Sequence, residues 1–379
     1  MTAKRFLGLD GLRGVCALTV LFYHCNYLFG GGTFFPHGYL AVDVFFVLSG
    51  FVISLTYEDK LRRGCGTRRF LLNRARRLFP TYWFGAVINI GLFIAMATAG
   101  YFAAKDAPWM IWIFIPATTL LLIPDYITPD GFVYPAMDSV AWSLFAEWVA
   151  YFAYSAGAFR WKTPWLFVVA AAGWGTMAFV CIHSGTAWDG GQGRSTLLTI
   201  GVLRCLPAFA AGVVIYRIHR HPLFGWLPVI TPEILLLFWF IAAMIPGSSP
   251  RPIVDILIVI AFSPLLVCLL VRSEQKAPAF CAPLGELSYP LYVAHPGLIM
   301  LAVYTPVFGE RWPSPLHATI LTLCCVLLSV GIAAVVRRLS RERGAHGHAI
   351  ARVVSRPPTE SLDIAWQQSP APGPDGLLS

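Results

Sequence analysis

Long apolar stretches alternate with short polar segments along this chain. A stretch of about twenty apolar residues crosses the roughly 30 Å hydrocarbon core of a bilayer as one helix. The pattern predicts about ten such helices, over 11–29, 39–57, 78–99, 139–159, 164–182, 197–216, 226–245, 253–271, 286–304 and 315–336. The fold class is therefore all-α, a polytopic integral membrane protein.

One further segment, 109–123, is apolar but short and interrupted by proline, so it is either an eleventh span or a re-entrant piece in the outer leaflet. Positive charge distinguishes the two counts, because Lys and Arg collect on the cytoplasmic side. With ten spans and a cytoplasmic N-terminus, most of the 28 Lys and Arg residues lie inside, and those outside are Lys105, Arg194, Arg251 and Arg311. An eleventh span would move the later basic clusters outside. The sequence therefore predicts ten spans with both termini cytoplasmic.

Composition agrees with a chain that folds in lipid. Hydrophobic residues make up 57% of the chain and charged residues 12%, where a soluble globular chain carries about a quarter charged. The net charge of +9 does not indicate nucleic acid, because Lys and Arg form short clusters that flank the apolar runs. The nine cysteines lie mostly within apolar runs and form no CxxC pair, which favours small buried side chains over disulfides or metal ligands.

The two ends of the chain carry separate signals. The first apolar run follows a basic segment, as in a signal peptide, but Asp10, Arg13 and His24 interrupt it and no small-residue cleavage site follows. It is interpreted as a retained span. The last part of the chain is rich in Arg, Pro, Gly and Ser, which predicts a membrane domain over 1–339 and a disordered cytoplasmic tail over 340–379.

Ionisable residues inside the predicted spans mark the candidate site, since each costs at least a few kcal/mol in a membrane. They are Arg13, His24, Asp43, Glu147, Arg204 and His295. Arg13 and His24 are about three helical turns apart, so they lie on one face, with Arg13 near the cytoplasmic mouth and His24 in the outer half. The alternative is an arginine that extends to the interface beside a packed, hydrogen-bonded histidine.

Two carboxylates are candidates for orienting His24. Asp43 lies about as far after the loop that joins the first two spans as His24 lies before it, so the two are expected at similar depth. Glu147 lies inside the fourth span, with Ser143 one turn before it on the same face and Trp142 close by. In other readings, Asp43 begins a helix at the outer interface, and Glu147 forms a structural hydrogen bond to another helix.

The segment 58–77, predicted as a cytoplasmic loop, is densely basic. Such loops set topology and contact anionic lipid. The stretch Arg74-Ala-Arg-Arg77, followed by Pro80 at the start of the third span, brings several guanidiniums to a helix end. Guanidinium groups bind phosphate oxygens in a two-point geometry, so this cluster predicts a seat for a polyphosphate ligand.

Together these residues resemble the membrane acyltransferase family 3, and the resemblance covers about 5–336. Each motif alone is weak, but their order and spacing make the resemblance specific. The motifs are LDGLRG at 9–14 running to His24, the stretch 38–51 with Asp43 and Ser49-Gly50-Phe51, Arg74-x-x-Arg77 with Pro80, Trp142-Ser143-x-x-x-Glu147, and 284–292 with Ser288, Tyr289, Tyr292 and then His295.

Members of that family move an acyl group, most often acetyl, from cytoplasmic acyl-CoA to a hydroxyl of a carbohydrate or other acceptor. The resemblance implies a multi-pass enzyme of a bacterial inner membrane, with acyl-CoA as co-substrate and no bound cofactor or metal. Its partners would be the lipid bilayer, acyl-CoA and a carbohydrate or glycosylated acceptor, and not nucleic acid. Some members carry a fused extracytoplasmic esterase-like domain. This sequence lacks one, so transfer is expected to finish in the membrane domain or on a separate extracytoplasmic partner.

That chemistry predicts His24 as the general base, because imidazole has an ordinary pKa near neutrality. Asp43 or Glu147 would orient it, and His295 is the rival imidazole. Gly50, beside Ser49, is expected to let the pantetheine arm of the donor approach the backbone. The predicted donor- and substrate-binding residues are Arg13, Ser49, Gly50, Phe51, Arg74, Arg77, Trp142, Ser143, Arg204, Ser288, Tyr289, Tyr292 and His295.

Two other classes of protein also bury ionisable residues in a membrane. A proton-coupled secondary transporter would use them as a relay, but no internal repeat is visible and the basic motif has no evident role in a carrier. A structural membrane subunit would use them only to hold helices together. Release of CoA by the purified protein would favour the enzyme over the carrier. A structural subunit predicts that substitution of His24 lowers stability but not specific activity.

Overall fold

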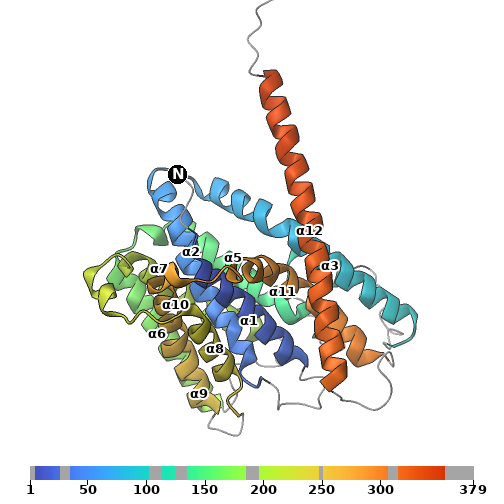
Figure 1. Cartoon of the computed structure of the whole chain (residues 1–379), viewed down its shortest axis with the longest axis horizontal. Coiled ribbons are helices and arrows are strands. Elements are labelled where there is room, and N and C mark those ends of the chain that lie inside the picture. Colours follow the sequence, from blue (N-terminus) through green and yellow to red (C-terminus); the bar gives the residue numbers. More distant parts are fainter. Residues whose placement is uncertain are drawn as a thin grey trace, which may run out of the picture. The chain divides into compact units, whose positions relative to one another are not determined.

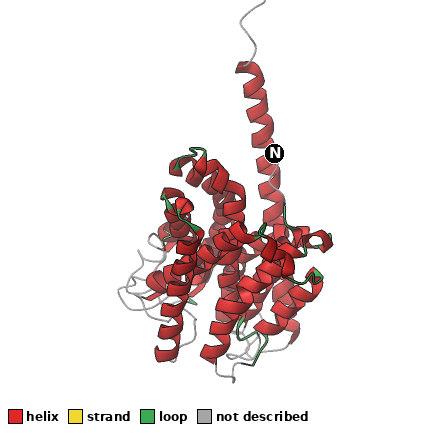
Figure 2. Ribbon diagram, turned by 90° about the vertical axis from the view of Figure 1, so that its left-hand side faces the viewer, coloured by secondary structure: helices red, strands yellow, loops and turns green. Residues whose placement is uncertain are grey.

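The computed structural model of the chain describes residues 5–25, 35–101, 113, 115–123, 135–184, 196–246, 251–305 and 315–354, and all regular elements within them are helices (Figures 1 and 2). The longer helices are α1 (Leu7–Cys25), α2 (Ala41–Arg62), α3 (Thr67–Thr98), α5 (Pro135–Ala156), α6 (Thr163–Ser184), α7 (Thr196–Ile218), α8 (Pro232–Ala243), α10 (Ser263–Arg272), α11 (Cys281–Tyr304) and α12 (Pro315–Val354). The shorter elements are η2 (Gly38–Leu40), α4 (Ile115–Leu121), η4 (Ala158–Arg160), η5 (Pro222–Trp226), α9 (Arg251–Leu257), η6 (Ile258–Phe262) and η7 (Glu274–Lys276).

Six of the described helical segments are long and apolar enough to cross a membrane. They are Gly38–Arg62, Thr67–Thr98, Thr163–His183, Gly201–Ile218, Pro252–Arg272 and Thr319–Leu339. The prediction of an all-helical polytopic membrane protein is confirmed at this level. The other predicted spans contain α1, α5, α8 and α11, of which α8 has only 12 residues. The count of ten spans and the cytoplasmic position of both termini stay predictions.

The short apolar segment 109–123 forms no long helix in its described part. There α4 has 7 residues, about 10 Å at about 1.5 Å per residue, which is far too short to cross a bilayer. It lies against α3, where Tyr82 Oη donates to Thr119 O and Trp83 Nε1 donates to Leu120 O. Whether the segment is re-entrant stays a prediction.

The third helix begins earlier than the sequence predicted. Thr67 is its first residue, so the cluster Arg74–Arg77 lies within α3 and not in a loop, and Pro80 is inside the helix. One face of this early part is packed. Phe70 is fully buried, and its ring meets that of Tyr57 edge to face, with the ring centroids 4.9 Å apart. Burial of that face stabilises helix where charge alone suggested an exposed loop.

The chain divides into two compact units, Met1–Ala333 and Ala334–Ser379. In the first unit α11 is central, since it packs against α1, α3 and α5. In the second, the described residues are the last part of α12, which continues through Val354. The sequence predicted disorder from 340 onward, so the helix over 340–354 departs from that expectation. Residues 355–379 lie outside the described part, and their disorder stays a prediction.

Helices α2 and α7 approach each other at two glycines. A Cβ atom at Gly50 would lie 2.0 Å from Phe209 O, and one at Gly212 would lie 2.0 Å from Val47 O. Such distances are impossible without movement of a backbone. Small residues that allow close helix contact are a common basis of packing in membranes, where the hydrophobic effect does not drive helices together.

Gly50→Val should therefore destabilise the protein, because over-packing a tight contact costs about 1–3 kcal/mol or more. We expect a lower apparent melting temperature in detergent by several degrees. Gly175→Val is the matched control, since a Cβ atom there would meet nothing within 4 Å. Equal melting temperatures of the two variants would contradict the close contact between α2 and α7.

Candidate active site

Two histidines from different helices meet inside the helical bundle. His24 lies in the last turn of α1, and His295 lies within α11 and is fully buried. Their Nδ1 and Nε2 atoms are 2.8 Å apart, and the rings are stacked with centroids 5.0 Å apart. The sequence treated the two imidazoles as rivals, whereas the structure joins them as a pair.

The hydrogen bonds of the pair define which nitrogen carries each proton. His295 Nδ1 is 3.0 Å from Leu291 O, and a carbonyl oxygen can only accept, so the proton of His295 is on Nδ1. His295 Nε2 is then the acceptor, and His24 Nδ1 donates to it. In a neutral His24 this leaves the lone pair on Nε2. That nitrogen is the atom able to take a proton.

The carboxylate of Asp43, which the sequence predicted to lie beside His24, pairs with Arg204. It forms a two-point ion pair with Arg204, with Arg204 Nη2 2.5 Å from Oδ2 and Arg204 Nε 3.3 Å from Oδ1. Both side chains are almost fully buried, and the Arg204 guanidinium also lies over the ring of Trp142 at 5.2 Å. Asp43 pairs with Arg204 because a buried guanidinium needs a counter-charge. The hydrogen-bond partner of His24 Nδ1 is His295.

Glu147 is the centre of a second polar cluster. Ser49 Oγ and Tyr151 Oη each donate to Glu147 Oε1 at 2.5 Å. Arg74 Nη2 in turn donates to Tyr151 Oη at 2.9 Å, and its guanidinium lies 5.0 Å from the centre of the Tyr151 ring. Ser49, Glu147 and Arg74, which the sequence identified separately, thus meet around Tyr151, where Glu147 accepts hydrogen bonds from Ser49 and Tyr151.

Arg74 begins a group of three guanidiniums. Arg74 is buried and its Nε has no hydrogen-bond partner among the described residues, while Arg77 is exposed. The positive charges of Arg74 and Arg13 both act on Arg77. Arg13 Nη1 is held 3.1 Å from Asp10 Oδ1, which supplies one counter-charge. Three cations with few neighbouring anions form a favourable place for a polyanion.

Residues of α5 and α11 lie between the histidine pair and the Glu147 cluster. Tyr292 Oη and Ser143 Oγ are 2.6 Å apart, and the Tyr292 and His295 rings have centroids 6.0 Å apart. Tyr289 is close enough to Glu147 and Arg74 for their charges to act on it. Ser288 Oγ donates to the backbone of its own helix, at Gly285 O. The structure therefore brings most of the predicted side chains into one polar region.

Two predicted binding residues have other surroundings. Gly50 is covered by the α7 backbone, so it permits helix contact and not the approach of a pantetheine arm. Phe51 is fully buried, and its ring meets Phe6 edge to face at 5.4 Å. The sequence pattern could not distinguish a glycine that meets a ligand from one that meets a neighbouring helix.

Several buried polar residues were missed from the sequence. Asp255 of α9 is fully buried, where its Oδ1 is 2.6 Å from His37 Nδ1 and its Oδ2 accepts from Tyr39 Oη. Asn89 of α3 donates from Nδ2 to Val293 O at 3.0 Å and accepts from Gly297 N at 3.2 Å, on the two sides of His295 in α11. Both Asp255 and Asn89 lie within apolar stretches of the sequence, and this position was the signal that could have identified them.

The chain matches a known family across nearly all of its first unit. Residues 6–334 match the family Acyl_transf_3, described as an acyltransferase domain. The chain belongs to this family and is a membrane acyltransferase. The resemblance drawn from its motifs is confirmed, and the carrier and the purely structural subunit are no longer candidates for its class.

Several known proteins are similar to parts of the chain. Protein 2 in the picA locus of Rhizobium radiobacter is 34% identical over 154 residues, which is 38% of this chain and 78% of that protein. Peptidoglycan O-acetyltransferase OatA of Listeria monocytogenes is 35% identical over 85 residues, 22% of this chain and 13% of the relative. Exopolysaccharide production protein ExoZ of Rhizobium meliloti is 29% identical over 136 residues, 35% of this chain and 39% of the relative. No solved structure shows significant similarity.

The pairing of Asp43 with Arg204 can be tested by a double-mutant cycle. Asp43→Asn or Arg204→Gln alone should destabilise the protein by about 3–5 kcal/mol, because each leaves one buried charge without its partner. The double variant should be destabilised by clearly less than the sum of the two. Unfolding in detergent gives the stability of the native protein, the two single variants and the double variant. Strictly additive losses of stability would show that the two side chains do not interact.

Proposed function

We propose that the protein transfers an acyl group, with acetyl as the expected case, from cytoplasmic acyl-CoA to a hydroxyl of a carbohydrate or glycosylated acceptor. One observation carries the proposal: the lone pair of His24 Nε2 lies at one end of a polar region whose other end holds Arg74, Arg77 and Arg13. A thioester donor with a phosphate-rich head and a reactive acyl end fits such a region in one orientation.

Three guanidiniums would bind the phosphates of CoA. Arg74, Arg77 and Arg13 lie toward the helix ends where the chain is most basic, which the predicted topology assigns to the cytoplasm. Arg74 Nε, buried and without a partner among the described residues, is a donor that a phosphate oxygen could satisfy. The pantetheine arm would then run between α3, α5 and α11 toward His24, past Tyr289 and Tyr292.

His24 would act as general base and then as general acid. Its Nε2 takes the proton of the acceptor hydroxyl while the oxygen attacks the thioester carbon. The C–S bond then breaks, and the CoA thiolate takes the proton from the imidazolium. His295 accepts the Nδ1 proton of His24 in a hydrogen bond, which fixes the ring and stabilises the cation that forms during transfer. No proton is gained or lost overall.

The names of two relatives support the proposed class of acceptor. Their printed names refer to O-acetylation of peptidoglycan and to exopolysaccharide production. A cell-envelope saccharide is therefore the proposed acceptor, reaching His24 from the outer side of the membrane domain. A separate extracytoplasmic protein that completes the transfer is the alternative. Mass spectrometry of surface glycans from cells with and without the acyltransferase identifies the acylated acceptor.

His24→Ala should lower the turnover of acyl transfer by a factor of at least about 10², the usual contribution of a general base. His295→Leu should reduce turnover less, because it removes only the partner of His24 Nδ1. His295→Gln should recover part of that loss, since an amide oxygen can accept the same hydrogen bond.

The control for these variants is His183→Ala, an exposed histidine on α6, which should leave turnover unchanged. All variants need normal expression and membrane insertion. If His24→Ala keeps near-normal turnover while His295→Ala loses it, the base is His295 and the assignment of His24 is wrong.

Arg74→Glu combined with Arg77→Glu should raise the KM for acyl-CoA by about tenfold or more, with a smaller effect on kcat and on the acceptor. Phosphate contacts form equally in the ground state and the transition state, so their loss is seen mainly in KM. Arg76→Glu is the matched control, because Arg76 is an exposed neighbour on the same helix. An unchanged KM in the double variant would remove the proposed phosphate seat.

A further inference from the structure

A second polar cleft lies away from the histidine pair. It has a volume of about 360 Å³ and lies where the ends of α7 and α10 meet the beginning of α1. Its lining includes Phe6, His219, Arg220, Phe224 and Arg272. In the predicted topology these helix ends are cytoplasmic, so the cleft lies at the level of the membrane surface and not within the hydrocarbon core.

The charge of the cleft is positive. Arg220 and Arg272 both border it and both are exposed. The carboxylate of Glu274 also borders it, but its two oxygens accept from Leu7 N at 2.7 Å and Gly8 N at 3.2 Å, so this charge serves the first turn of α1. Two guanidiniums thus face a cleft whose nearest acid is already bound by backbone donors.

The surroundings of the cleft are amphipathic. Its inner wall contains Phe6, Phe224 and Val271, which are each only 7% exposed. The short helix η5, which follows α7 in the chain, exposes Leu223 to 69% and Trp226 to 86%. Exposed aromatic and aliphatic side chains at a helix end are typical of the interface between lipid and water. A ligand here would meet cations on one side and apolar surface on the other.

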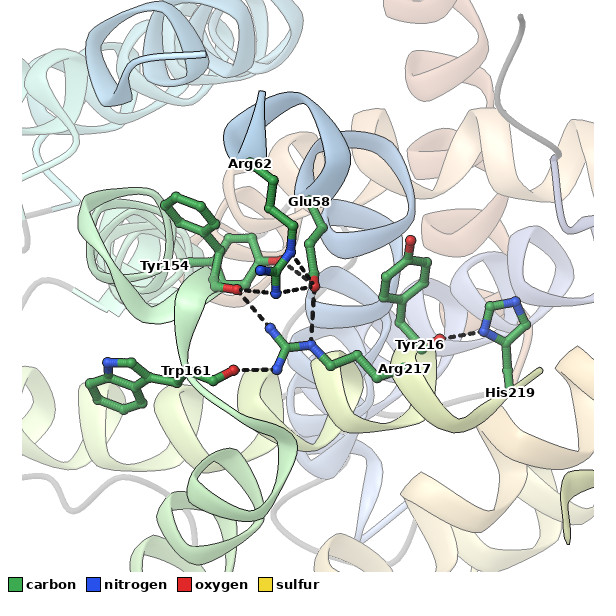
Figure 3. Close-up of polar contacts among 8 residues, drawn as sticks. Glu58, Arg62, Tyr154, Trp161, Tyr216, Arg217 and His219 are labelled. Carbon is green, nitrogen blue, oxygen red and sulfur yellow. Dashed lines mark hydrogen bonds and ion pairs between the residues drawn. The ribbon is translucent and has the colours of Figure 1, made fainter. Parts of the chain in front are cut away.

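The segment that follows α7 contributes His219 and Arg220 to the lining, and the end of α7 is held in place by a neighbouring cluster. Arg217 donates to Trp161 O at 2.5 Å and lies 3.2 Å from a Glu58 oxygen, and Arg62 and Tyr154 donate to the same carboxylate (Figure 3). Close to this cluster, His219 Nδ1, just after the end of α7, donates to Tyr216 O in its last turn. A wall fixed in this way binds a ligand without a large cost of ordering.

We propose that this cleft binds the phosphate of an anionic phospholipid of the cytoplasmic leaflet, with Arg220 and Arg272 on the phosphate and the acyl chains along η5. Basic pockets between transmembrane helices at the cytoplasmic side bind anionic lipid head groups. The shared chemistry is a phosphate on a largely apolar body, which a soluble nucleotide also carries. The exposed Trp226 and Leu223 favour the lipid, because a nucleotide would leave them in water.

The test uses the full chain, purified in a neutral detergent, with phosphatidylglycerol and phosphatidylcholine of identical acyl chains as probes. Native mass spectrometry should show retained phosphatidylglycerol, with at least fivefold weaker retention in Arg220→Gln/Arg272→Gln. Phosphatidylglycerol should also raise the melting temperature of the native protein more than phosphatidylcholine does, since a ligand that binds the folded state stabilises it.

Arg68→Gln/Arg69→Gln is the matched control, because it removes two exposed arginines from the basic segment of α3 and should retain the lipid normally. If the cleft variant fails to fold, Arg220→Gln alone carries the test, since this guanidinium is exposed. Equal retention by the native protein and the cleft variant would overturn the proposal. It would also be overturned if adenosine 3′,5′-bisphosphate displaced the lipid and gave the larger thermal shift, which would assign the cleft to a nucleotide. Neither readout depends on acyl transfer.

Discussion

The close approach of α1 and α11 is the constraint on which the site depends. A Cβ atom at Gly14 would lie 2.6 Å from Leu284 Cβ, and one at Gly285 would lie 2.6 Å from Asp10 Cβ, so only glycine fits at these crossings. At this separation His24 of α1 and His295 of α11 come within hydrogen-bond distance. Larger residues at the crossings would push the two helices apart and so separate the two imidazoles.

The second constraint is that lipid provides no partner for a buried charge or polar group, so each must find one inside the bundle. Arg204 satisfies Asp43, and His37 and Tyr39 satisfy Asp255. The histidine pair and the guanidiniums of α1 and α3 are the groups to which we assign the proposed chemistry.

The sequence predicted the helical membrane fold and identified many of the polar residues that the structure brings together, because long apolar stretches and the polar residues within them are both visible along one chain. It could not predict partners across helices. Depth alone placed Asp43 beside His24, whereas the rotation of α2 and α7 directs Asp43 to Arg204. Basic composition made Arg74 look like a loop residue, although packing of Phe70 extends α3 through it. Pairing and helix bounds depend on packing, which a single sequence does not contain.

In the mechanism that we propose, His24 presents a lone pair on Nε2 because His295 accepts the proton of Nδ1 in a hydrogen bond. Nitrogen-15 NMR of the histidine side chains in lipid, assigned by comparison with the His24→Ala and His295→Ala variants, measures this directly. We expect that the neutral form of each ring carries its proton on Nδ1, and that the His24 signal shifts when His295 is replaced. A proton on Nε2 of neutral His24, or a His24 signal unaffected by loss of His295, would contradict it.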